Sequence, residues 1–258
     1  MFVGRMKSAA TRVLPRALCV ERIKRTNQAP CIPGQSRLHC TNSKPADADS
    51  ALAMAPTHTQ PVGLLHEKLV FGRRVRILSH WFAQLAPRGV RVLDVGCGDG
   101  LISALMGSKR PDIEIVGVDV LPREHPHIPV QMFDGTRIPF ADKSFDLVLF
   151  SDVLHHTNDP RILLQEAQRV ASKHVLIKDH CREGVLANAR LRFMDWVGNA
   201  RFGVALPYNY WTERQWHAAW RELGLQPERL VTSLGLYPKP ADWIFGANLH
   251  FIALLQRT

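Results

Sequence analysis

The stretch Val92-Leu93-Asp94-Val95-Gly96-Cys97-Gly98-Asp99-Gly100 decides the fold of this 258-residue chain. Its first half is a short apolar run typical of a buried strand, and three glycines follow. Leu101–Met106 comes next and has the composition of a helix. Glycines at such a junction let the backbone turn tightly and approach a ligand, and the first helix amides can face an electron-rich group. The stretch therefore predicts a ligand-binding strand–turn–helix unit.

Strands and helices alternate around this stretch. The apolar runs predict strands over Arg91–Val95, Ile113–Val118, Val130–Phe133, Phe145–Phe150, Val175–Ile177, Leu230–Leu236 and Leu249–Leu255. Helical spacing predicts helices over Leu64–Leu85, Leu101–Met106, Pro160–Ala171 and Thr212–Leu223, the third with Ile162, Leu163, Ala167 and Val170 on its apolar side. The short, proline-containing connections Leu121–Pro129 and Gly135–Ser144 predict shortened or missing helices. This alternation predicts an α/β fold, with a seven-stranded, mostly parallel sheet and helices on both faces.

Residues 1–60 differ from the rest of the chain. They hold nine Lys/Arg against three Asp/Glu, which is +6 of the net charge of +10, and show no sustained periodicity. We expect a disordered or processed basic extension there and one folded domain over residues 61–258. The basicity of the extension is thus a poor argument for nucleic-acid binding by the folded part. We expect a cytoplasmic protein, with a mitochondrial location as the alternative if the Arg-rich start is a transit peptide.

Membrane spans, disulfides and metal sites find no support in the sequence. No run of 18 apolar residues appears, so no transmembrane segment is predicted. The five cysteines, an odd number with loose spacing, fit neither a disulfide framework nor a zinc site. No other ligand spacing stands out, so we predict no metal site, with His180 and Asp179 as the alternative.

A second acid and the glycine spacing narrow the choice of ligand. Asp119 ends the second predicted strand, where a carboxylate can accept hydrogen bonds from both ribose hydroxyls. A dinucleotide site needs the spacing G-x-G-x-x-G, but Leu101 stands where its last glycine would be. S-adenosylmethionine (SAM) has no pyrophosphate, and its ammonium group suits an acid such as Asp94. The alternative for Asp94 is a structural role in holding the glycine turn.

The segment from about Val90 to Val175 resembles the class I SAM-dependent methyltransferases, in particular the small-molecule and quinone-pathway group. The glycine stretch matches their first motif, and two later segments match in order: Asp134–Phe140 and Phe145–His156. The resemblance implies a Rossmann-like fold, SAM as the methyl donor and methyl transfer as the activity. After His180 the likeness is one of architecture only.

The resemblance also assigns the cofactor-binding residues. Gly96, Cys97, Gly98 and Gly100 would line the methionine end of SAM with Asp94, while Asp119 and Val120 would lie at the ribose. Asp134 and Gly135 would flank the adenine, and Ser151 and Asp152 would lie near the sulfonium. Each acid has a simpler alternative: Asp134 as the cap of a turn, and Asp152 as the start of a helix.

The acceptor side is predicted less sharply. His155 and His156 follow the fourth strand, and Asp179 and His180 follow the fifth, so all four are candidates for holding the acceptor or taking its proton. Accurate placement alone can accelerate a methyl transfer, so a base is not required. Tyr208, Tyr210 and Trp211 are candidates for a substrate pocket, and ordinary core packing is the alternative.

These patterns predict transfer of a methyl group from SAM to an oxygen, carbon or nitrogen of a small molecule, with an apolar or lipid-like acceptor as one option. A nucleic-acid or protein methyltransferase is the first alternative. The segment Ser151-Asp152-Val153-Leu154 lacks the Asn/Asp-Pro-Pro-aromatic pattern associated with amino-group methylation of bases. A protein that binds SAM without catalysis is the second alternative.

Overall fold

The computed structural model describes residues 71–121, 123–199, 207–239, 241–246 and 248–258. The chain divides into two units, Met1–Met54 and Ala55–Thr258, and every described residue belongs to the second. The predicted basic extension, its boundary at residue 60 and the first part of the helix predicted over Leu64–Leu85 lie outside the described residues. Among the helices of the described ranges, none combines the length and the apolar character needed to cross a membrane.

Seven strands form one sheet, in the order β3-β2-β1-β4-β5-β7-β6. The strands are β1 (Arg91–Val95), β2 (Glu114–Asp119), β3 (Val130–Met132), β4 (Phe145–Ser151), β5 (Ala171–His180), β6 (Leu225–Val231) and β7 (His250–Arg257). The first five run parallel, and β7 is antiparallel to both of its neighbours. The predicted mostly parallel sheet is confirmed, and its strand order reverses between β1 and β4, where sheets of this kind bind ligands.

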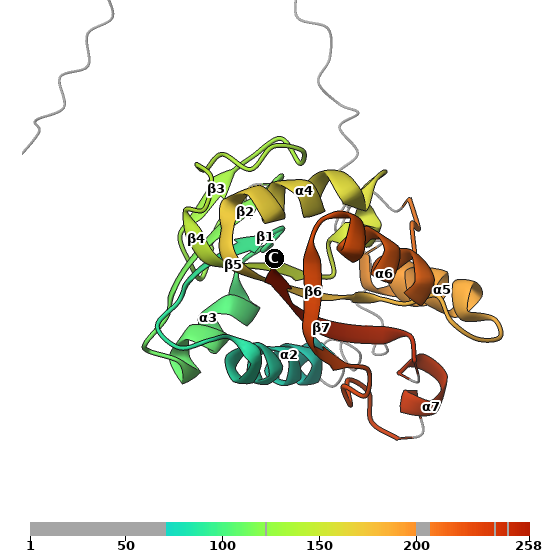
Figure 1. The fold of residues 1–258 in the computed structure, drawn as a ribbon. Coiled ribbons are helices and arrows are strands. Elements are labelled where there is room, and N and C mark those ends of the chain that lie inside the picture. Colours follow the sequence, from blue (N-terminus) through green and yellow to red (C-terminus); the bar gives the residue numbers. More distant parts are fainter. Residues whose placement is uncertain (1–70, 122, 200–206, 240, 247) are drawn as a thin grey trace, which may run out of the picture. The chain divides into compact units, whose positions relative to one another are not determined.

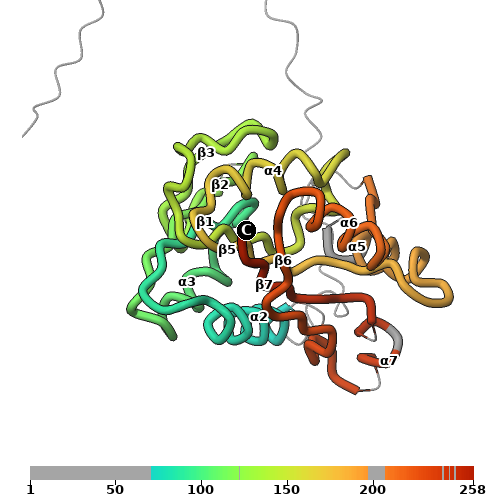
Figure 2. Tube along the Cα trace, viewed as in Figure 1, coloured from blue at the N-terminus to red at the C-terminus, as the bar shows by residue number. Residues whose placement is uncertain are grey.

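Helices cover both faces of the sheet, as predicted (Figure 1). One face packs against α2 (Gly72–Leu85) and α3 (Leu101–Lys109), and the other packs against α4 (Pro160–Val170) and α6 (Glu213–Glu222). Alternate residues of each strand point to opposite faces: Val148 and Phe150 of β4 pack with α4, whereas Leu147 and Leu149 pack on the side of α2. Figure 2 follows the same chain as a trace from α2 to β7.

Local signals explain where the helices begin and end. Asp159 caps α4 by accepting a hydrogen bond from the backbone of Arg161, with Pro160 as the first helical residue. Thr212 caps α6 through a reciprocal capping box with Gln215, as its predicted start implied. In the described parts of the connections 121–129 and 135–144 there is no helix, which confirms that prediction.

Some predicted boundaries are wrong. The sixth strand is Leu225–Val231 and not Leu230–Leu236, because Leu234 and Leu236 lie in a loop and are buried on the α2 side of the sheet. Strand β5 extends to His180, well beyond the predicted end at Ile177. In α4 the side chain of Ile162 is exposed, and Leu164 takes its place in the core.

Two helices, α5 (Ala187–Asn199) and α7 (Ala241–Phe245), and the short 3-10 helix η2 (Leu154–His156) have no counterpart in the prediction. Helix α3 also runs three residues past Met106, its predicted end.

Candidate functional site

The glycine turn lies at the carboxyl end of β1, next to the point where the strand order reverses. Gly96, Gly98 and Gly100 have φ angles of 72°, 59° and 75°, a region that side chains disfavour. A Cβ atom on Gly96 would lie 2.6 Å from Cγ2 of Val153, whereas one on Gly98 would meet nothing within 4 Å. The turn is therefore packed against the protein at Gly96 and open at Gly98.

The carboxylate of Asp119 is part of the same turn. Its Oδ2 accepts a hydrogen bond from the backbone N–H of Gly98 at 2.7 Å, and its Oδ1 accepts one from Leu121 at 2.9 Å. The side chain is largely buried at the end of β2. The residue predicted to bind the ribose thus also holds the backbone of the glycine turn.

Asp94 is buried beneath the turn with one oxygen unused. Oδ2 accepts a hydrogen bond from the hydroxyl of Ser103 at 2.6 Å, but Oδ1 has no hydrogen-bond partner among the described residues. Burial raises the pKa of Asp94 to about 7. The buried hydroxyl of Ser151, at the end of the neighbouring strand β4, also lacks a partner in the described part of the chain. Two buried polar groups without a hydrogen-bond partner among the described residues thus lie near the carboxyl ends of β1 and β4. This arrangement suits a polar ligand.

Asp134, Gly135 and Val120 lie beyond β2 and β3. A single oxygen of Asp134, Oδ1, accepts hydrogen bonds from the backbone of Thr136 and Arg137 at 2.7 Å each, and these bonds lower its pKa. Asp134 therefore caps a turn, which was the simpler of the two interpretations of this residue. Its second oxygen, Oδ2, takes no part in these hydrogen bonds. A Cβ atom on Gly135 would lie 3.1 Å from Cγ1 of Val120, whose side chain is half exposed.

Asp152 is the centre of a buried ion-pair network. It has a φ of 60°, and its carboxylate pairs with Arg74 of α2 and with Lys178 of β5. Burial alone would raise the pKa of Asp152, but the two cations hold it well below its usual range. Burial also lowers the pKa of the fully buried Lys178 to about 8. Asp152 does not start a helix, since η2 begins at Leu154.

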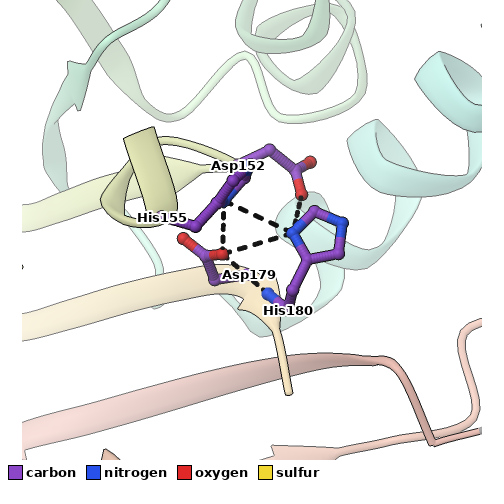
Figure 3. A group of neighbouring side chains, drawn as sticks. All are labelled: Asp152, His155, Asp179 and His180. Atoms are coloured by element: carbon purple, nitrogen blue, oxygen red, sulfur yellow. Dashed lines mark hydrogen bonds and ion pairs between the residues drawn. The ribbon is translucent and has the colours of Figure 1, made fainter. Parts of the chain in front are cut away.

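The four predicted catalytic residues come together at the carboxyl ends of β4 and β5. His155 Nδ1 lies 2.6 Å from Asp179 Oδ1, and His180 Nδ1 lies 3.4 Å from the same oxygen. Figure 3 shows these three side chains converging with Asp152. His156 lies beside His155 with the ring centroids 4.1 Å apart.

Charge is unevenly divided among these histidines. Burial alone would lower the pKa of His155, but the charges of Asp179 and Asp195 raise it to about 10. Burial and the positive charge of the neighbouring His155 together lower the pKa of His180 to about 4. Near neutral pH, His155 is thus the cationic ring and His180 the neutral one.

Sequence reasoning missed Asp195, on α5. Its Oδ2 accepts a hydrogen bond from the hydroxyl of Tyr210 at 2.7 Å, and its Oδ1 lies 3.5 Å from His155 Nε2. Arg74 was missed as well. The only signal for Asp195 was an acid within an aromatic-rich stretch, and nothing in the spacing linked it to His155.

The three predicted pocket residues take different places. Tyr210 is buried, with its ring 5.5 Å from that of His155. Trp211 packs in the core, 4.9 Å from Trp216. Tyr208 is partly exposed beneath the guanidinium of Arg192, 4.1 Å from the ring centre. Only Tyr210 therefore joins the histidine cluster.

Comparison with known proteins identifies a methyltransferase domain in this chain. A family model described as a methyltransferase domain covers residues 70–230. An uncharacterized methyltransferase of Mycobacterium sp. (strain KMS) is 39% identical over 94 residues, covering 34% of this chain and 36% of the relative. A ubiquinone biosynthesis O-methyltransferase of Azorhizobium caulinodans is 34% identical over 127 residues, covering 44% and 48%. The chain thus spans less than half of the length of these curated relatives.

Solved structures share the fold at low sequence identity. A SAM-dependent methyltransferase of Thermotoga maritima, named as a possible histamine N-methyltransferase, superimposes with a TM-score of 0.54 and 19% identity. The superposition covers 76% of this chain and 93% of that one. Because the family model matches more than half of the sequence, and the fold and motifs agree, the chain belongs to the class I SAM-dependent methyltransferases.

Proposed function

We propose that this chain transfers the methyl group of SAM to an oxygen, carbon or nitrogen atom of a small molecule. The observation that carries the proposal is the unpartnered Oδ1 of Asp94, buried beneath the glycine turn. A buried acceptor without a donor costs free energy, and the ammonium group of SAM would supply that donor. The fit of the residues to the cofactor therefore rests on a specific unsatisfied atom.

The remaining cofactor contacts follow the same edge of the sheet. Asp119 would accept hydrogen bonds from the ribose, and the adenine would lie between Val120 and the turn at Asp134 and Gly135. The open space at Gly98 leaves room for the methionine end, which the turn amides would contact. The sulfonium would then lie near Ser151 and Asp152 at the end of β4.

The histidine cluster is the proposed acceptor side. His155, His156, Asp179 and His180 follow β4 or end β5, and they share one edge of the sheet with the glycine turn. In the transfer, a bond forms between the acceptor atom and the methyl carbon as the bond to sulfur breaks. The electron pair of that bond stays on sulfur and yields S-adenosylhomocysteine, and the proton of the acceptor leaves to solvent or to a neutral ring such as His180. Named relatives include O- and N-methyltransferases of small molecules, which supports an acceptor of this class.

Calorimetric titration with SAM, S-adenosylhomocysteine and NADH tests the donor. We expect micromolar binding of the two sulfur compounds and none of NADH. A screen with radiolabelled SAM against small hydroxyl, amine and quinol compounds, with RNA and protein as comparison acceptors, then tests the transfer. Methylation of RNA or protein in preference to every small molecule would contradict the proposal. SAM binding without any turnover would favour a non-catalytic protein.

A further inference from the structure

A cavity of about 390 Å³ lies between α6, the loop after β5 and the strands β6 and β7. Strand β7 begins at His250, which lines the cavity and pairs with His180 at the end of β5. The cavity therefore lies at the same edge of the sheet as the histidine cluster. Its volume is within the range of about 300–1,000 Å³ that is typical of small-molecule sites. The residues proposed above for SAM and for the acceptor do not line it, so it is a site of its own.

The cavity has an aromatic wall. Trp216 and Trp220, one turn apart on α6, both contact Phe251 of β7 edge to face, with ring centroids 5.2 and 5.9 Å apart. All three rings belong to the core between the sheet and its helices, which fixes their positions. Leu230 of β6, which is 44% exposed, adds an apolar side chain to the lining. Such a wall suits an apolar or aromatic body, and aromatic rings, tryptophan above all, attract organic cations.

Two carboxylates set the charge of the cavity. Glu183 and Glu213 line it, and none of the lining residues is lysine or arginine. Among the described residues, Glu213 forms an ion pair with His217 at 3.8 Å, and Glu183 forms none. Burial, with the charges of Glu183 and Glu213, raises the pKa of the Cys181 thiol to about 11, so this thiol stays neutral near pH 7. The cavity therefore favours a positively charged ligand.

The start of α6 offers an anion little in return. A helix N-terminus attracts anions through its free backbone amides. Here the amide of Glu213 already donates to Oε1 of Glu183 at 3.0 Å, and the amide of Gln215 donates to the hydroxyl of Thr212. The two acids thus also stabilise the first turn of the helix, but that role requires neither the cavity nor its aromatic wall.

We propose that this cavity binds an organic ammonium compound. Its apolar or aromatic part would lie against the wall formed by Trp216, Trp220 and Phe251, and its ammonium group would lie beside Glu183 and Glu213. Aromatic rings with nearby carboxylates are a recurring means of recognising such cations. Binding in this cavity does not require SAM, so the site goes beyond the proposed methyl transfer and is tested apart from it.

Three probes that share a phenyl ring and differ in charge test the site on the full chain. Phenethylamine is the cation, 2-phenylethanol the neutral compound and phenylacetate the anion, and NMR titration measures their affinities. We expect phenethylamine to bind at least about 10-fold more tightly than 2-phenylethanol, because it alone gains cation–π and carboxylate contacts. Phenylacetate should bind most weakly. Binding of phenethylamine no tighter than that of the alcohol would overturn the proposal.

Substitutions in the lining then locate the bound probe. Glu183→Gln keeps an oxygen that can accept the Glu213 amide, so the double variant Glu183→Gln, Glu213→Gln should fold and lose the preference for phenethylamine. Leu230→Trp, at an exposed position, should fill the cavity and weaken binding of phenethylamine. Glu222→Gln is the matched control, because it removes an exposed acid of α6 that does not line the cavity. This variant should bind all three probes as the wild type does.

Two outcomes with these variants would overturn the site. One is an unchanged preference for phenethylamine in the folded double variant, and the other is undiminished binding of phenethylamine by Leu230→Trp. SAM is titrated separately and should bind equally to the wild type and to every variant. A chain that binds phenethylamine but not SAM would keep this site and lose the proposed methyl transfer, and the reverse result would do the opposite.

Discussion

The backbone N–H of Gly98 donates a hydrogen bond to the carboxylate of Asp119 at 2.7 Å, so the end of β2 holds the turn that follows β1. The two residues are 21 positions apart in the sequence. One carboxylate therefore links the two parts of the proposed cofactor site, and its removal should affect both.

Replacing Asp119 by alanine removes the proposed ribose contacts and frees the Gly98 and Leu121 amides. We expect SAM affinity to fall by about 1.5–3 kcal/mol, since hydrogen bonds to a charged group have this strength. Calorimetry on the purified variant measures the change. Asp142→Ala is the control, because it removes an exposed acid that is not among the proposed cofactor-binding residues. This variant should bind SAM as the wild type does. Unchanged SAM affinity in Asp119→Ala would refute the ribose assignment.

Replacing Gly98 by valine places a side chain in the open space of the turn. The φ of 59° adds backbone strain of about 1–3 kcal/mol, but no protein atom is close enough to clash. We expect a folded variant without measurable SAM binding. Gly89→Val is a matched control, because Gly89 has a φ of 61° and is equally open but lies outside the site. If both variants bind SAM normally, the turn does not approach the cofactor.

The raised pKa of Asp94 predicts a pH dependence of SAM binding. The ammonium of SAM favours the ionised carboxylate, but the free protein keeps Asp94 protonated up to about pH 7. SAM affinity should therefore rise with pH, by about 5–10-fold between pH 6 and 7.5. Calorimetry across this range measures the slope. Asp94→Asn should bind SAM weakly and lose the slope, and an unchanged slope in that variant would assign the titration to another group.

The same shift has a consequence for stability in the absence of SAM. Folded Asp94 holds its proton up to about pH 7, whereas the unfolded side chain releases it near about pH 3.9. Between these values the folded state binds more protons, so the contribution of Asp94 to stability falls as pH rises. Urea unfolding of wild type and Asp94→Asn at pH 5 and 7.5 checks the sign. The wild type should lose more stability than the variant over this interval.

Lys178 should matter for folding because it is fully buried against Asp152. Lys178→Met leaves the carboxylate with Arg74 alone, and removing one partner of a buried ion pair costs about 3 kcal/mol or more. Urea unfolding measures the loss. Lys173 lies on the same strand as Lys178 and forms an exposed pair with Asp146 of β4, so Lys173→Met should cost less than about 1 kcal/mol. Equal effects of the two substitutions would show that the buried network adds no stability.

The sequence predicts the central strands well because they are buried on both faces. β1 matches its predicted range, and β2 and β4 are each within one residue, since a continuous apolar run is a strong signal. β6 was missed because it is an exposed edge strand with little apolar pattern. The spacing of Leu234 and Leu236 by two residues resembles the alternation of a strand. In the structure both side chains are instead buried from a loop on the α2 side of the sheet.

The two halves of the site differ in how far the sequence reveals them. The proposed cofactor half can be predicted because its three glycines lie within five consecutive residues and Asp119 ends the next strand. The half of the site around the histidine cluster cannot be predicted in this way. Asp195 of α5 lies next to His155, and Arg74 of α2 lies next to Asp152, only because of where these helices pack. Such contacts depend on how helices cross the sheet, and no spacing along the chain records that.

The two outer strands of the sheet have a consequence for how the protein behaves at high concentration. An exposed strand edge offers unpaired backbone groups on which another chain can align and aggregate. Here β3 has three residues, and β6 carries Pro227, Glu228 and Arg229, with an irregular register at this point. A short edge on one side, and proline with charge on the other, resist recruitment of further strands. These two edges thereby oppose the addition of further strands to the seven of the described sheet.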